Sequence, residues 1–197
     1  MSPKTSRNGH GYWRSLEQLA DDPGALEFVA RELSSRPGHS HEGTAEGRGL
    51  WLGSRLDRPL RICGVVKNQG EPGGGPFWVR DSDGGTTLQI VESASVDLDD
   101  SDQARIWGSS THFNPVDIVA AVRHRHGKSY PLEEFVDWDG VFVADKSSHG
   151  RELRALERPG LWNGAMAHWN TVFVEVPLET FAPVKKIVDL LDPSHSA

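Results

Sequence analysis

The sequence is poor in cysteine, because Cys63 is the single thiol among its 197 residues. One thiol excludes an internal disulfide, and it also excludes iron–sulfur binding because a cluster needs several thiolate ligands. Cys63 lies in an apolar segment that is rich in β-branched residues. We therefore expect a small core residue at this position rather than a nucleophile.

Long apolar runs and an excess of positive charge are missing too. No stretch approaches the roughly 18 consecutive apolar residues of a membrane-spanning helix, and the N-terminus contains no apolar signal core. The formal net charge is −7, whereas a duplex nucleic-acid binder normally needs a basic face. We expect a cytoplasmic protein with no membrane span and no nucleic-acid partner.

The common catalytic signatures are absent as well. The chain has no Ser-His-Asp order of a hydrolase, no metalloprotease helix motif and no CxxC pair, so hydrolytic and redox chemistry have no support. It also contains no Walker A loop and no GxGxxG segment. Phosphoryl or nucleotidyl transfer, in which a protein chiefly positions charge, remains as the enzymatic option, and the catalytic residues are unknown.

A loop with three consecutive glycines, at positions 73–75, is the most informative feature that is present. Residues 62–66 and 77–79 are short apolar runs, so the loop is expected to connect two strands. Glycine permits positive φ and lets a ligand approach the main chain, and successive amides can bind an anion, to which Lys67 would add positive charge. The alternative is a flexible hairpin loop in which Lys67 and Glu71 are merely solvated.

The first third of the chain predicts a helical segment over residues 1–35 and then a linker. Asp22 and Pro23 form an N-cap and a first-turn proline, and apolar residues follow as one helical stripe at 26, 29, 30 and 33. This stripe would dock on the main domain or on another protein. Residues 36–49 contain few apolar residues and several glycines, which is typical of a flexible linker.

Beyond residue 50 the pattern changes to short strands and short helices separated by turn signals. A hairpin is expected around residues 81–85, and a strand covered on both faces over 116–122. The other expected elements are strands at 141–143 and 171–176 and helices at 103–107 and 183–191. Together these elements predict a mixed α/β domain over 50–192, followed by a tail at 193–197.

Polar side chains gather just before one of the apolar runs. His112, Asn114 and Asp117 lie there, and Pro115 biases Asn114 toward an extended conformation. Asn114 would hydrogen-bond hydroxyl groups, and Asp117 would bind a hydroxyl or Mg²⁺. The alternatives are that Asn114 caps a turn and that Asp117 pairs with an arginine such as Arg123.

A segment nearer the C-terminus combines indole and amide side chains. Trp162, Asn163 and Asn170 lie in a stretch that is rich in small residues. An indole face covers the apolar C–H surface of a sugar or base, while an amide binds hydroxyl groups. Trp162 and Trp169 would equally serve as core residues.

Sequence blocks between residues 50 and 192 resemble the C-terminal part of a bacterial family known as domain of unknown function 4301. The blocks are RICGVVKN at 61–68, GEPGGGPF at 70–77, LQIVES at 88–93, THFNPVD at 111–117, PGLWNGAM at 159–166 and WNTVFVEVP at 169–177. The resemblance implies a partial nucleotidyltransferase-like mixed sheet with flanking helices, a sugar phosphate or nucleotide-sugar as ligand, and Mg²⁺. Lys67 and the 73–75 loop would then meet phosphate, while Glu92 and Asn114 would meet sugar hydroxyls.

Complete members of that family are longer and carry a nucleotide-binding segment ahead of this part. Nothing upstream of Leu50 resembles such a segment. We therefore expect the sugar-phosphate-binding half of a sugar-1-phosphate nucleotidyltransferase-like protein, without the complete catalytic equipment.

Residues 11–33 resemble a different group, the twin-arginine leader motif of the iron–sulfur subunits of molybdopterin oxidoreductase complexes. In that group a twin arginine, an apolar stretch and cysteine clusters follow, whereas here Arg36 is single and no cysteine cluster is present. This resemblance implies an alternative function, a noncatalytic binding or assembly module whose N-terminal helix docks on a membrane oxidoreductase complex.

The candidate ligand-binding residues are Lys67, Asn68, Glu71, Gly73, Gly74, Gly75, Glu92, His112, Asn114, Asp117, Trp162, Asn163 and Asn170. Asp117 is also the candidate metal ligand. We expect the amides of the glycine loop and the carboxamide of Asn114 to converge on one hollow that holds a small polar molecule.

Overall fold

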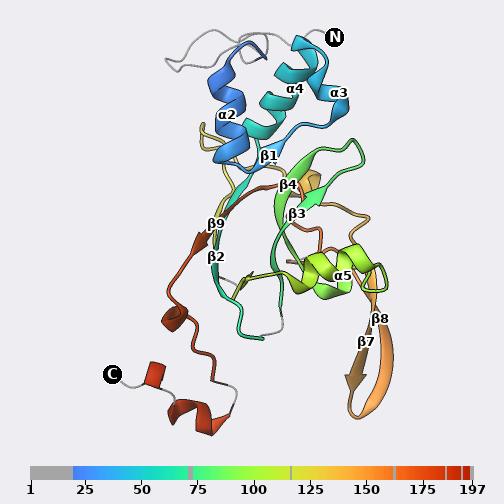
Figure 1. Cartoon of the computed structure of the whole chain (residues 1–197), viewed down its shortest axis with the longest axis vertical. Helices are drawn as coiled ribbons and strands as arrows, with labels where there is room; N and C mark the ends of the chain where they lie inside the picture. The colour runs from blue at the N-terminus through green and yellow to red at the C-terminus, as the bar shows by residue number, and fades with distance from the viewer. Residues whose placement is uncertain are drawn as a thin grey trace.

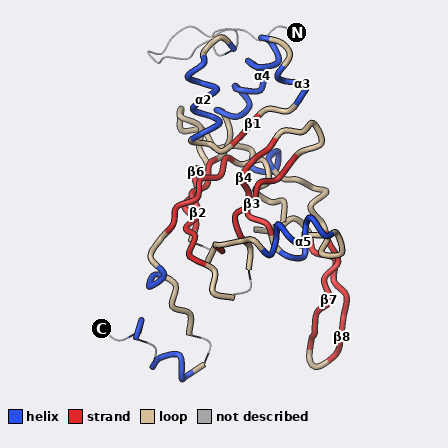
Figure 2. Tube along the Cα trace, in the orientation of Figure 1, coloured by secondary structure: helices blue, strands red, loops and turns tan. Residues whose placement is uncertain are grey.

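Short helices and three small β-sheets make up the described part of the chain. The computed structural model describes residues 20–70, 73–115, 117–161, 163–184, 186–191 and 193–195. The N-terminal helices lie at one end of the molecule, the larger sheets occupy the middle, and a β-hairpin and the C-terminal segment extend away from it (Figures 1 and 2). The expected mixed α/β class is confirmed.

Helix α2 (Pro23–Arg31) begins as its sequence predicts. Asp22 is the N-cap, and its Oδ1 accepts a hydrogen bond from the Gly24 N–H at 2.9 Å. The apolar stripe of α2 packs against helix α4 (Ala45–Leu56), where Val29 is fully buried together with Trp51 and Leu52. Of the two expected docking surfaces, the structure therefore shows the one within the chain.

The prediction of a flexible linker over 36–49 is wrong for most of that segment. Helix α3 (His39–Glu42) lies within it, and α4 begins there. Thr44 is the N-cap of α4, and its hydroxyl accepts a hydrogen bond from the Gly47 N–H at 3.0 Å. A distant carboxylate holds α3, because the Ser40 hydroxyl donates to Asp83 Oδ2 at 2.6 Å. This contact joins positions 43 residues apart, so a local composition rich in glycine gave no sign of it.

Strand β2 (Leu60–Lys67) is the centre of a four-stranded sheet. It pairs antiparallel with β5 (His112–Phe113) and β6 (Ile118–Ala121), and parallel with β9 (Asn170–Glu175). Cys63, near the middle of β2, is buried, which confirms the expected core residue.

A second sheet is built on the hairpin of β3 (Gly75–Arg80) and β4 (Thr86–Val91), with β1 (Ser35–Arg36) on the other edge of β4. The turn is closed by Asp81, whose Oδ1 accepts from the Gly85 N–H at 2.7 Å, so the predicted hairpin is confirmed. Strand β3 belongs to this sheet and not to that of β2. The glycine loop therefore connects two sheets rather than the two strands of one hairpin.

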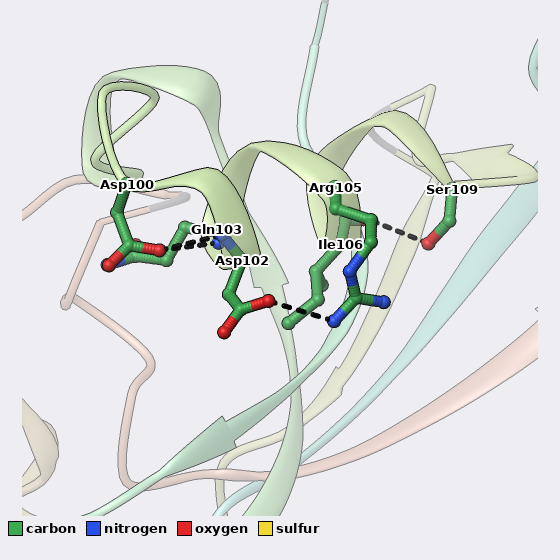
Figure 3. Close-up of polar contacts among 6 residues, drawn as sticks. All are labelled: Asp100, Asp102, Gln103, Arg105, Ile106 and Ser109. Atoms are coloured by element: carbon green, nitrogen blue, oxygen red, sulfur yellow. Dashed lines mark hydrogen bonds and ion pairs between the residues drawn. The ribbon is translucent and has the colours of Figure 1, made fainter.

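Helix α5 (Ser101–Gly108) confirms the predicted short helix and supplies one wall of the site described below. Its N-cap is Asp100, whose Oδ1 accepts from the N–H groups of Asp102 and Gln103, both at 2.9 Å (Figure 3). Arg105 in the last turn forms an ion pair with Asp102 at 3.2 Å. Charges of both signs thus lie where the helix dipole favours them.

The hairpin of β7 (Phe142–Ser148) and β8 (Arg151–Glu157) forms the third sheet and projects away from the other two (Figure 1). Two expectations fail in the exposed parts of the chain. The strand expected to be covered on both faces is β6, but Val119 is 70% exposed, so the face of β6 on which it lies is largely uncovered. The expected helix over 183–191 is the short 3₁₀ turn Ile187–Leu191, with Ile187 87% exposed and no apolar face packed.

Candidate functional site

A pocket of about 280 Å³ lies beside the glycine loop. We call it the glycine-loop pocket. Four segments meet there, namely the loop that follows β2, the start of β3, the end of β4, and the stretch from α5 into β5. The lining residues are Asn68, Gly70, Gly73, Gly75, Phe77, Ser93, Trp107, Ser110, His112 and Phe113.

The loop backbone has the shape that its glycines allow. Gly70 and Gly73 have φ of +104° and +151°, a region that residues with a Cβ rarely adopt. Asn68 begins the turn, because its Oδ1 accepts from the Gly70 N–H at 2.8 Å. Gly74 and Gly75 are needed for close packing: an added Cβ would lie 2.6 Å from Ile90 Cγ2 at position 74 and 2.9 Å from the His112 carbonyl oxygen at position 75.

Aromatic rings form an apolar wall of the pocket. Phe77 of β3 stacks on Trp107 of α5, with ring centroids 5.2 Å apart and an interplanar angle of 13°. Phe113 of β5 packs edge to face on Phe181, with centroids 5.0 Å apart. Each of these pocket rings is thus held by a second ring. The wall offers ring surface to the C–H groups of a ligand.

Polar groups also lie at the pocket, where β2 and β5 pair. Lys67 and His112 face each other as Cα partners, so their side chains leave the same face of the sheet. His112 Nδ1 lies 2.8 Å from Thr111 Oγ1, and its Nε2 lies 3.2 Å from Glu175 Oε2. The Ser110 hydroxyl donates to the His112 carbonyl oxygen at 2.9 Å. These contacts fix the orientation of the His112 ring at the edge of the pocket.

Glu92 lies directly behind the glycine loop, at the end of β4. Its Cγ would lie 3.6 Å from a Cβ added at Gly74, and its neighbour Ser93 lines the pocket. Partial burial raises the pKa of Glu92 above its ordinary value. The carboxylate is thus close to the loop and less well solvated than a surface acid.

A family model described as domain of unknown function (DUF4301) matches residues 14–196. The chain belongs to this family. The match begins at residue 14 rather than at residue 50, so it also includes the helices α2 to α4 and most of the 11–33 segment.

Solved structures similar to this DUF4301 chain include UDP-glucose pyrophosphorylase from Leishmania major. Two mutants of that enzyme in complex with UDP-glucose are each 20% identical, with TM-scores of 0.39 and 0.40, and each alignment covers 74% of this chain and 33% of the other. The open and closed structures of the enzyme are 20% identical with a TM-score of 0.38, over 77% of this chain and 34% of the other. The chain thus spans about a third of the length of these solved chains. No curated protein matches the sequence.

Seven of the candidate residues of this DUF4301 chain gather at or beside the glycine-loop pocket. Four of them line it, and the other three are adjacent through strand pairing or the packing of the loop. The seven are Lys67, Asn68, Gly73, Gly74, Gly75, Glu92 and His112. Glu71 and Trp162 lie outside the described residues.

Asn114 is close to the loop, but its side chain serves the backbone. Its N–H donates to the Gly74 carbonyl oxygen at 2.8 Å, while its Nδ2 donates to the Gly64 carbonyl oxygen at 2.5 Å. The residue is 2% exposed and does not line the glycine-loop pocket. The backbones of the loop and of residue 114 thus lie together, while the carboxamide of Asn114 ties the chain between β5 and β6 to β2.

The last three candidates lie elsewhere. The Asn163 side chain donates to the Gly140 carbonyl oxygen at 2.7 Å, and Asn170 donates to the Arg55 carbonyl oxygen at 2.7 Å, so both amides stabilise turns and strand ends. Asp117 is exposed, and its backbone carbonyl accepts from the Gly64 N–H. Among the described residues, no group of three or more histidine, cysteine or acidic side chains lies together as a metal site would require, so the role of Asp117 as a metal ligand stays a prediction.

The sequence did not point to Ser93, Trp107, Ser110 or Glu175. Ser93 lies two residues after the end of β4, and Ser110 two residues after the end of α5. Trp107 is one of two large apolar residues on the short helix α5, next to Ile106, which is a usable signal. Glu175 had no signal, because it meets His112 across 63 residues of chain. In the described part of the chain, no helix has both the length and the apolar character for crossing a membrane.

Proposed function

We propose that the glycine-loop pocket binds the phosphorylated end of a sugar phosphate or nucleotide-sugar, as the ligand-binding part of a nucleotidyltransferase-like protein. The supporting observation is that the glycine loop, two serines and His112 line one pocket that also has an aromatic wall, with Lys67 next to it as the Cα partner of His112. Phosphate prefers amide, lysine and imidazole donors, while the C–H face of a sugar prefers an aromatic ring.

The proposed roles follow from position. The amides around Gly73 and Gly75, with Lys67 and His112, hold the phosphate, and Trp107 covers the sugar ring. Glu92, next to Gly74, accepts a hydrogen bond from a sugar hydroxyl. Asn114 positions the loop, because its amide N–H holds the Gly74 carbonyl oxygen.

The pocket volume of about 280 Å³ is at the lower end of known ligand pockets, which hold roughly 300–1,000 Å³. It therefore fits a monosaccharide phosphate better than a whole nucleotide-sugar. We propose that this chain provides the sugar-phosphate pocket and that nucleotidyl transfer needs parts beyond those described here.

Titration calorimetry with glucose 1-phosphate, glucose and inorganic phosphate tests the proposal. Lys67 is exposed, so the Lys67→Gln variant should fold normally. Its affinity for glucose 1-phosphate should be about tenfold lower, because a hydrogen bond from a charged donor contributes about 1.5 kcal/mol. Lys128→Gln is the matched control, since Lys128 is exposed and outside the pocket. Equal affinities of the two variants, or no saturable heat with the unmodified chain, would refute the proposal.

The alternative of a docking module for a membrane oxidoreductase complex depends on a free apolar stripe in the N-terminal helix. In the structure Val29 is fully buried against Trp51 and Leu52, so the centre of that stripe is already covered within the chain. Nothing in the part of the chain that the structure describes favours this second function.

A further inference from the structure

A second cavity, of about 190 Å³, is lined in part by residues of β3 and β4. Arg61 of β2 and Gln89 of β4 form its polar end, and Ile90, Met166 and Ala167 are among its apolar walls. We call it the Arg61 cavity. Its lining shares no residue with that of the glycine-loop pocket.

Arg61 is a buried cation, with only 2% of its surface exposed. Its Nε donates to Thr171 Oγ1 at 2.9 Å, and its Nη2 donates to Gln89 Oε1 at 2.6 Å. Both acceptors are neutral. A guanidinium has five N–H groups, so three of them donate to no acceptor within the described ranges.

No carboxylate of the described residues forms an ion pair with Arg61. Asp137 also lines the cavity and is the one carboxylate among its described lining residues, and its Oδ1 accepts from the Asp139 N–H at 3.0 Å. Burial lowers the pKa of Arg61, which means that its surroundings disfavour the charged form. A buried charge without a counter-charge costs several kcal/mol, so folded proteins normally supply one.

We propose that the Arg61 cavity binds a small anion, a phosphate or carboxylate group, through the free edge of the Arg61 guanidinium. The planar fork of arginine matches two oxygens of either group. The neutral partners Thr171 and Gln89 hold the fork in place without consuming its charge. Because the volume is well below that of ordinary ligand pockets, the ligand is a single anionic group with few attached atoms, which the apolar walls accommodate.

This site is separate from the proposed sugar-phosphate pocket, and the test keeps the two apart. Inorganic phosphate is titrated into the full chain at constant ionic strength, with sodium chloride as the replaced salt, and acetate serves as the carboxylate probe. Saturable binding of phosphate, of acetate or of both is expected. Arg61→Gln should weaken this binding at least tenfold.

Two further variants make the result decisive. Ala167→Leu keeps Arg61 but fills the cavity, and it should also weaken this binding at least tenfold. If Arg61→Gln fails to fold, as judged by circular dichroism, Ala167→Leu decides. Arg151→Gln removes one positive charge at an exposed hairpin position and should bind as the unmodified chain does.

Several outcomes overturn the inference. They are the absence of saturable binding to the unmodified chain, an unchanged affinity in Arg61→Gln or Ala167→Leu, and a loss of affinity in Arg151→Gln as large as that in Arg61→Gln. Loss of phosphate binding in Lys67→Gln with retention in Arg61→Gln would place the anion in the glycine-loop pocket instead. Conversely, glucose 1-phosphate binding can fail while phosphate binding at Arg61 persists, so either proposal can fail alone.

Discussion

Gly75→Ala provides a direct test of how tightly the glycine loop packs. Gly75 has ordinary negative φ, but an added Cβ would lie 2.9 Å from the His112 carbonyl oxygen, 3.2 Å from Phe77 Cε2 and 3.2 Å from Ser110 Oγ. The closest of these atoms belongs to the backbone of a paired strand, so β3 and β5 must move apart to admit the methyl group.

The expected size of the effect comes from two opposing contributions. Overpacking of this kind costs about 1–3 kcal/mol, whereas replacing an unstrained glycine by alanine gains about 0.4–1 kcal/mol by restricting the unfolded chain. We expect a net loss of about 1–2 kcal/mol in the free energy of unfolding. Urea denaturation, monitored by circular dichroism, measures it.

Gly108→Ala is the matched control, because nothing lies within 4 Å of a Cβ added there, at the end of α5. The free energy of unfolding of this variant should rise by about 0.4–1 kcal/mol, because alanine restricts the unfolded chain and no clash opposes it. If the two variants shift the unfolding free energy equally, the loop does not pack against β5 as the structure describes, and the geometry of the glycine-loop pocket is wrong.

Two other predictions concern stability. Val29→Ala removes two methyl groups from a fully buried side chain and should lower the free energy of unfolding by about 2 kcal/mol. The same change at Val119, which is 70% exposed, should lower it by less than about 0.5 kcal/mol. Thermal unfolding of both variants measures the difference. Burial raises the pKa of Glu92, so the folded state holds its proton to higher pH than the unfolded state, and stability falls as pH rises from the unfolded value of 4.5 through the folded pKa. Glu92→Gln should remove this decline in urea titrations between about pH 4 and 7; an unchanged pH profile would show that Glu92 is fully solvated.

Local signals accounted for several elements of the fold. The Asp22 cap with Pro23, the turn from Asp81 to Gly85 and the acidic start of α5 each act within a few residues, and each was predicted. The same is true of the buried Cys63 within an apolar run.

Long-range contacts explain what the sequence did not show. Asp83 binds helix α3 from 43 residues away, and the His112 ring meets Glu175 from 63 residues away. Asn114 shows the same limit within the site. From its residue type and its place before a proline, the side chain could bind either a ligand or a backbone carbonyl. The fold places the Gly64 carbonyl oxygen next to it as the acceptor.

The pairing of β2 also has a consequence for how the chain is made. Its partners come late, and the parallel ladder to β9 joins Leu60 to Asn170, 110 positions further on. Local hairpins such as β3–β4 close quickly, whereas so distant a pairing carries a larger entropic cost and forms slowly. During synthesis, therefore, one edge of β2 stays open until the ribosome has released residues 170–175, and in that interval it is a place where nascent chains can pair with one another.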